Sequence, residues 1–425
     1  MLSAQLNDLM VFFLAAFVAA ALLRGFLSAL NIRHLRRHGH EIPEVFGETI
    51  DAETLAKISR YTLDSSRFGT LEGLFDDILT LLVLLSGLLP ALLGLLPSWE
   101  DHFILTGLLF FGLLALASGL IGIPFDLYRT FVIERRHGFS TITLRLWVID
   151  LFKGLGVSAV LMGALLAGFL ALMQFTPQTW WFWTWLLVAA FQLIMLWLYP
   201  VVIAPLFNKF EPVKDSNLRD AIVALMAKVE LKTEGVYQVD AGKRSRHTNA
   251  YFTGLGKTKR IVLYDTLIAS HTKEEIVAVL AHEIGHWRGR HILKQLLFME
   301  AASFVVLWLA SHLVAWPLLY ETFGFDRPVP FVGLLLAAIL AGPLTLFFTP
   351  AVSAVLRRFE READASVAGL TGTTAPLVSA LKRLARDNLA NLHPHPLYAR
   401  VYYSHPPLAE RIASLTAASE PKNAL

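Results

Sequence analysis

Apolar residues run along this chain in long blocks that polar segments separate. A helix needs about 20 apolar residues to cross the hydrocarbon core of a bilayer. Blocks of that order, with few or no charges, occupy residues 9–32, 78–99, 103–124, 154–173, 180–207, 301–320 and 328–356. The pattern predicts a mainly α-helical, polytopic membrane protein with about seven transmembrane helices.

Basic residues are unevenly distributed among the connecting segments. Segments 33–77 and 125–153 are rich in Arg and Lys, whereas 98–102 and 174–179 have none and 321–327 has only Arg327. Cytoplasmic loops carry the excess of positive charge, so the N-terminus is expected outside, and the polar segments after the fifth and seventh blocks, with the C-terminus, in the cytoplasm. No Lys or Arg precedes the first block, which favours a retained helix over a cleaved signal peptide.

The polar regions at 208–300 and 357–425 are thus expected on one side of the membrane, where they can form one domain. We divide the chain into transmembrane helices one to five (1–207), the first part of this domain (208–300), helices six and seven (301–356), and its second part (357–425). Short β-branched and aromatic runs at 235–240, 249–254 and 260–265 predict a small sheet, with a hairpin turn at 254–257. Thr272 and Glu275 have capping-box spacing, which marks the start of a helix.

That helix carries His282, Glu283 and His286 in the pattern HExxH. Histidines four residues apart lie on one helical face, so both imidazoles can reach one metal ion. Glu283 can then act as general base towards water at the open position of the metal. The chain has no cysteine, so a metal has to be held by His, Asp or Glu. The motif predicts one Zn²⁺ per chain.

The third ligand has two possible sources. One class of zinc protease extends the motif to HExxHxxGxxH, and Gly289 fits this pattern, but Ile292 stands at its last position. His291 comes one residue early and would point away from the first two histidines on a continuing helix, so we expect it to be a polar residue near the membrane surface. The other class takes a glutamate from a separate helix. Glu360 and Asp364 share a helical face, as ligand and as acceptor for a ligating histidine, but spacing alone leaves a solvated charged face equally plausible.

Composition narrows the function classes. Hydrophobic residues make up 55% of the chain and charged residues 17%, against about 25% charged in a soluble domain. The net charge is only +3 and basic residues are spread along the chain, so no nucleic-acid partner is predicted. A lipid bilayer and a peptide or protein substrate are the expected partners.

Several segments carry a family resemblance. They are AHEIGHW at 281–287, FEREAD at 359–364 and YSHPPLAER at 403–411, with further matches at 123–124, 134–139, 199–200, 205–210, 249–252 and 261–266. In this order they closely resemble the type I CAAX prenyl proteases, integral-membrane zinc metalloendopeptidases. The resemblance runs from about the third span to the C-terminus.

The resemblance implies a fold in which seven tilted helices enclose a chamber, closed at its cytoplasmic end by the zinc domain. It assigns Glu360 as the third zinc ligand, His405 as a histidine that stabilises the oxyanion, and Arg411 as a residue close to the site. Asn249, Ala250 and Tyr251 match an edge strand against which an extended substrate adds itself to the sheet.

The chemistry implied is peptide-bond hydrolysis, with Glu283 as general base and His405 beside the oxyanion. The substrates implied are prenylated CAAX proteins or peptides that lose their C-terminal tripeptide. Two alternatives stay open: membrane-protein quality control on unlipidated chains, and a non-enzymatic seven-span protein with structural zinc. No endoplasmic-reticulum retrieval signal is visible, which favours a bacterial-type cytoplasmic membrane, with the endoplasmic reticulum as the alternative.

Overall fold

Six helices in the described part of the chain are long and apolar enough to span a membrane, and a bent pair can supply a seventh. The computed structural model describes residues 4–230, 235–253 and 260–419. Four of the six are single helices: α1 (Asp8–His38), α6 (Leu144–Phe175), α12 (His291–Val314) and α14 (Pro330–Thr371). The other two start with α4 (Phe103–Tyr128) and α7 (Trp180–Leu198). The helix of α4 continues through Arg129–Ile133 and α5 (Glu134–Arg136), and that of α7 through Tyr199–Ile203 and α8 (Ala204–Phe207).

The bent pair corrects the second predicted span. A block at 78–99 was expected, but α2 runs over Ala52–Leu85 and meets α3 (Leu88–Gly94) at an angle of 56°. The first half of α2 carries charged residues and lies within segment 33–77, which was expected to be a loop. Charge does not end a helix, and Asp77 of α2 is paired with Arg24 of α1 at 2.7 Å. Hydropathy alone therefore placed this helix too far along the chain.

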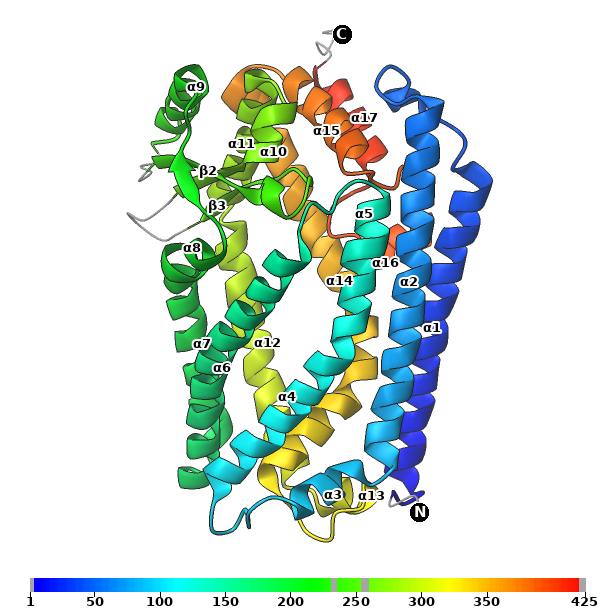
Figure 1. Cartoon of the computed structure of the whole chain (residues 1–425), viewed down its shortest axis with the longest axis vertical. Helices are drawn as coiled ribbons and strands as arrows, with labels where there is room; N and C mark the ends of the chain where they lie inside the picture. Colours follow the sequence, from blue (N-terminus) through cyan, green and yellow to red (C-terminus); the bar gives the residue numbers. More distant parts are fainter. Residues whose placement is uncertain (1–3, 231–234, 254–259, 420–425) are drawn as a thin grey trace, which may run out of the picture.

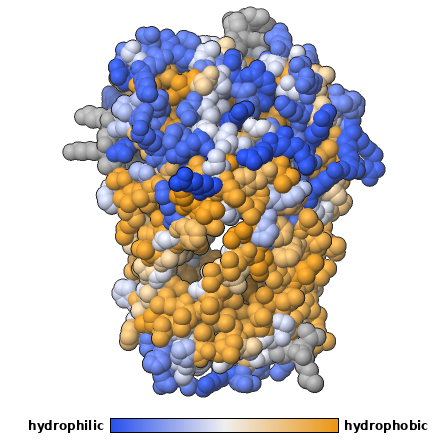
Figure 2. Space-filling model, in the orientation of Figure 1, coloured by the Kyte–Doolittle hydropathy of each residue, from blue (hydrophilic) through white to orange (hydrophobic). Residues whose placement is uncertain are grey.

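The long helices surround an interior space. Figure 1 shows α1 with α2 on one side of the lower half and α6 with α7 on the other, while α4, α12 and α14 cross between them. Figure 2 shows a broad apolar band across the visible face of this half, with an opening in the band that leads inward. Hydrophilic side chains cover the upper end and a thin lower rim. The predicted fold class, membrane helices around a chamber with a domain at one end, is confirmed.

The domain contains a four-stranded mixed sheet of order β1-β2-β4-β3. Its strands are β1 (Phe210–Pro212), β2 (Gly235–Val239), β3 (Ala250–Thr253) and β4 (Arg260–Tyr264). The last three were predicted, and β3 pairs antiparallel with β4 as a hairpin requires. The predicted turn at 254–257 lies outside the described residues, and β1 was not predicted. Because β3 pairs with β4 alone, it is an edge strand.

Both polar regions contribute to one core. Buried residues of this core come from positions 213–284 and 367–415, and a third group, at 46–58, comes from the segment before and in the first turns of α2. Phe139, which follows α5, adds a fourth segment. The helices of the domain are α9 (Ser216–Ala227), α10 (Asp265–Ser270), α11 (Lys273–Arg288), α15 (Ala375–Asp387), α16 (Pro396–Tyr402) and α17 (Leu408–Ser419); α13 (Pro317–Thr322) lies at the opposite end. The capping box predicted at Thr272 and Glu275 is present at the start of α11.

Candidate metal centre

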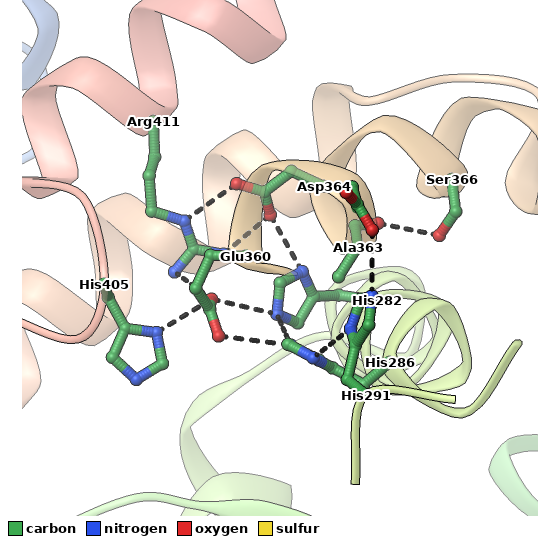
Figure 3. Close-up of polar contacts among 10 residues, drawn as sticks. His282, His286, His291, Glu360, Ala363, Asp364, Ser366, His405 and Arg411 are labelled. Atoms are coloured by element: carbon green, nitrogen blue, oxygen red, sulfur yellow. Dashed lines mark hydrogen bonds and ion pairs between the residues drawn. The ribbon is translucent and has the colours of Figure 1, made fainter. Parts of the chain in front are cut away.

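Two helices bring three possible metal ligands together. His282 and His286 lie on one face of α11, and α14 continues beyond the apolar band to place Glu360 opposite them (Figure 3). The Nε2 atoms of the two histidines are 3.2 Å apart. Glu360 lies 3.4 Å from His282 Nε2 through Oε2 and 3.1 Å from His286 Nε2 through Oε1. No other group of three or more His, Cys, Asp or Glu residues in the described ranges has ligand atoms this close.

Close packing of α11 against α14 makes this convergence possible. A Cβ added at Gly285 would lie 2.8 Å from the Cα of Ala363 and 2.9 Å from its carbonyl oxygen. Such distances are below van der Waals contact, so a side chain at Gly285 would force the helices apart. The glycine between the two histidines therefore sets the separation between their imidazoles and Glu360.

A buried carboxylate faces the other side of the first histidine. Asp364, one turn after Glu360, lies 2.8 Å from Nδ1 of His282. Arg411 of α17 donates two hydrogen bonds to Asp364, at 2.9 and 2.7 Å, and all three side chains are buried. A histidine that binds metal through one nitrogen usually donates the other N–H to such an acceptor.

A cavity of about 540 Å³ opens beside the three residues. His282, Glu283, His405 and Arg411 line it, together with an apolar wall of Leu267, Val279, Leu377, Leu381, Leu384 and Leu408. Burial raises the pKa of Glu283 above its usual range, and the neighbouring histidines oppose this shift only in part. Because Glu283 lines the cavity next to His282, its carboxylate can act as general base towards a water held there.

His405 reaches the site from the turn between α16 and α17. Its Nδ1 lies 2.7 Å from Oε2 of Glu360, and 61% of its side chain is exposed. The ring can therefore meet both the carboxylate and a molecule in the cavity.

The edge strand β3 and the preceding Asn249 border two separate pockets. Asn249 and Ala250 line the cavity beside the metal ligands. Tyr251 points to the other face of the sheet and lines a separate pocket with Tyr199 and Tyr264. Of the three residues expected against a substrate, Asn249 and Ala250 therefore border the cavity, and Tyr251 borders the separate pocket.

The expected direction of the His291 ring was wrong. The chain does not continue as one helix: α11 ends at Arg288, α12 begins at His291, and Arg290 between them has a φ of 51°. This turn folds the His291 ring back onto His286, with their Nδ1 atoms 3.0 Å apart. His291 is only 1% exposed, and it is the first residue of the membrane-length helix α12.

The residues present fit zinc. Two imidazole nitrogens and one carboxylate, with the remaining side of the site towards a cavity, are the donor set of a catalytic zinc centre. A structural zinc normally has four protein ligands. Cysteine is absent from the chain, so the nitrogen and oxygen donors are the ones available.

Two histidines of one helix and a glutamate of a second, set at the end of a multi-span bundle, define an integral-membrane metallopeptidase. Residues 31–209 match the family described as CAAX prenyl protease N-terminal, five membrane helices, and residues 212–419 match Peptidase family M48. The chain therefore belongs to the M48 peptidases of the CAAX prenyl protease type, as the resemblance predicted.

Characterised relatives extend over nearly the whole chain. CAAX prenyl protease 1 of Saccharomyces cerevisiae is 33% identical over 409 residues, and the alignment covers 90% of each chain. The human CAAX prenyl protease 1 homolog is 31% identical over 432 residues, again with 90% of each chain covered. The crystal structure of S. mikatae Ste24p matches with a TM-score of 0.89 and 30% identity, over 96% of this chain and 99% of that one. This membership argues against a purely structural metal.

Sequence reasoning missed part of the surroundings of the site. Asn388, Asn391 and Tyr403 line the cavity from the C-terminal region, but no spacing ties them to the HExxH helix. For His291, the signal in the sequence was Gly289. A glycine there allows the helix to end and leaves room for the His291 ring beside it.

Proposed function

We propose that this protein is a zinc endopeptidase that removes the C-terminal tripeptide from prenylated CAAX proteins or peptides. The observation behind the proposal is the convergence of His282, His286 and Glu360 at a cavity that Glu283 and an edge strand also border. The relatives named CAAX prenyl protease 1 cover 90% of the chain, which supports the same substrate class. The opening in the apolar band gives a lipid-bearing chain a route inward (Figure 2).

The chemistry divides among a few side chains. His282, His286 and Glu360 would hold zinc, which when bound would supply a Lewis acid for water and for the carbonyl oxygen. Glu283 takes the proton from the attacking water and passes a proton to the leaving amine. His405 donates to the carbonyl oxygen as it becomes negative. An extended substrate pairs with the free edge of β3, which orients its scissile bond.

A second candidate is proteolysis of unlipidated membrane or polypeptide substrates. Arg411 is the single Lys or Arg side chain among the described residues that line the cavity, and Asp364 already binds its guanidinium. The described lining therefore offers no unpaired Lys or Arg to bind the C-terminal carboxylate of a substrate. A longer substrate, which continues beyond three residues after the scissile bond, would contact the same groups as a CAAX peptide.

The two candidates separate in one experiment with paired peptides, one farnesylated at a C-terminal CAAX motif and one unmodified. Purified wild type and Glu283→Gln are compared in detergent by mass spectrometry. We expect loss of the last three residues from the farnesylated peptide, and a rate about 10²–10⁴-fold lower in the variant. Equal cleavage of both peptides would favour the second candidate, and a variant as fast as wild type would remove Glu283 from its role.

The membrane side belongs to the proposal as well. We place the metal centre on the cytoplasmic side, because the basic segments 33–77 and 125–153 lie towards the same end of the molecule as the domain. A bacterial-type cytoplasmic membrane stays a prediction from the sequence.

A further inference from the structure

His286 has a partner of its own at the nitrogen that faces away from the metal. Its Nε2 points to His282 and Glu360, and its Nδ1 lies 3.0 Å from Nδ1 of His291. A histidine that binds a metal through Nε2 carries its proton on Nδ1. Nδ1 of His291 is then the acceptor of that proton, and the opposite nitrogen of His291 carries its own.

The opposite nitrogen also has an acceptor. His291 Nε2 lies 3.1 Å from Oε2 of Glu362, whose other oxygen accepts from Arg358 at 2.9 Å. The ring of His291 is stacked on Phe359, with centroids 4.3 Å apart and planes inclined by 10°. Position, ring plane and tautomer of His291 are thus all fixed by residues of α14, and only its Nδ1 remains for His286.

The backbone is built to allow this approach. A Cβ added at Gly289 would lie 2.3 Å from Nε2 and 2.7 Å from Cε1 of His291. Arg290, which caps α12, adopts the left-handed conformation with a φ of 51°. Such a conformation costs a non-glycine residue free energy, and it persists where surrounding contacts demand it. Both features bring one ring back against the end of the metal-binding helix.

We propose that His291 is a positioning residue that orients His286 for the metal. It does so by accepting a hydrogen bond from the Nδ1–H of His286. The inference rests on the zinc site proposed above. The two histidine ligands would then be held differently: His282 by the Asp364 carboxylate and Arg411, His286 by a neutral imidazole that Glu362 fixes. His291 does not line the cavity, so it acts through His286 and not on the substrate.

Two substitutions separate hydrogen bonding from packing. In His291→Asn the side-chain oxygen takes the place of Nδ1, so the acceptor is kept and the stacked ring is lost. In His291→Phe the ring is kept and the acceptor is lost. Zinc affinity is measured on the full-length protein in detergent by competition with a chelator, together with the visible spectrum of the Co²⁺-substituted protein. Folding is checked by gel filtration and by the thermal midpoint of metal-free protein.

We expect His291→Phe to bind zinc about 10–100-fold more weakly, as for other residues that orient a metal ligand, and His291→Asn to stay within a few-fold of wild type. Gly289→Ala, which displaces the ring, should resemble His291→Phe. Wild-type affinity in His291→Phe, or an equal loss in His291→Asn, would overturn the proposal. The wild-type titration tests the zinc site itself, so failure of the site and failure of the role of His291 give different results.

Discussion

At the scale of single residues, the metal centre depends on charges that are buried in pairs. Glu360, Asp364 and Arg411 are all less than 9% exposed. A buried charge that loses its partner costs about 3–5 kcal/mol, whereas removal of both partners together costs much less. Asp364 has two tasks, because it faces both His282 and Arg411.

Substitution of Asp364 tests both tasks. Asp364→Ala should weaken zinc binding about 10–100-fold, since His282 loses its acceptor. It should also destabilise the protein by up to about 3–5 kcal/mol, since the buried Arg411 loses both hydrogen bonds and keeps only Glu360, at 3.9 Å. The double variant Asp364→Ala/Arg411→Leu should regain much of the stability but not the zinc affinity. Chelator competition and thermal unfolding in detergent measure the two effects. Recovery of both in the double variant would contradict this division.

At the scale of elements, the site depends on the pairing of α11 with α14. Three local features create this pairing. They are the capping box that starts α11, Gly285 of α11, which lets α14 approach, and the length of α14, which carries Glu360 to the domain. Each can be changed without touching a metal ligand.

Gly285→Ala should separate the two helices. The new Cβ meets the backbone of Ala363, and overpacking of this kind typically costs about 1–3 kcal/mol. We expect a lower thermal midpoint and weaker zinc binding, since Glu360 moves away from the histidines. Gly369→Ala in the partner helix α14 is the control, because a Cβ there meets nothing within 4 Å. Equal behaviour of the two variants would show that the close approach is unimportant.

The capping box gives α11 a pH-dependent stability. Burial by itself would raise the pKa of Glu275, but the Ser379 hydroxyl, the Thr272 amide and Arg383 outweigh it and lower that pKa. A carboxyl whose pKa is lower when folded stabilises the protein above its unfolded pKa of about 4.3, and the stabilisation is lost as pH falls through the folded value.

Glu275→Gln should therefore lower the thermal midpoint at pH 7, by an amount corresponding to about 1 kcal/mol as for other caps. Its midpoint should also change less than that of wild type when the pH falls below about 4.3. Glu274→Gln is the control, because the Glu274 side chain is 63% exposed and pairs only with Lys273 among the contacts at this turn. A control that behaves like Glu275→Gln would rule out the capping carboxylate as the cause.

At the scale of the whole molecule, the membrane helices carry at one end a domain assembled from four parts of the chain. Residues 46–58, Phe139, 213–284 and 367–415 share its core, although transmembrane helices separate them in the sequence. The N-terminal end of α1 and the domain lie at opposite ends of the molecule (Figure 1). The orientation of the bundle therefore decides on which side proteolysis occurs.

The absence of cysteine makes this orientation directly measurable. Single cysteines are introduced at Ser98, exposed beyond α3, and at Ala224, exposed on α9 of the domain. An impermeant maleimide applied to intact cells should label Ser98→Cys and leave Ala224→Cys unlabelled until the cells are opened. The reverse pattern would place the metal centre outside, and the cysteine-free parent controls for background.

The sequence by itself determined the features that depend on local pattern. Apolar blocks predicted the membrane helices, charge bias an orientation that remains to be tested, β-branched runs three of the four strands, and helical spacing the shared face of His282 and His286. These follow from short stretches of chain, because a helix or strand places neighbours in the sequence in fixed directions. The resemblance to a known family added Glu360, which spacing alone left open.

Only the tertiary structure decided which distant side chains meet. The break after Arg288 turns His291 onto His286, and the long α14 brings Glu362 and Phe359 to the same ring. The bend between α2 and α3 and the use of residues 46–58 in the domain core also depend on packing between segments far apart. Hydrophobic burial and close approach of helices are properties of surfaces in contact, so no single stretch of sequence contains them.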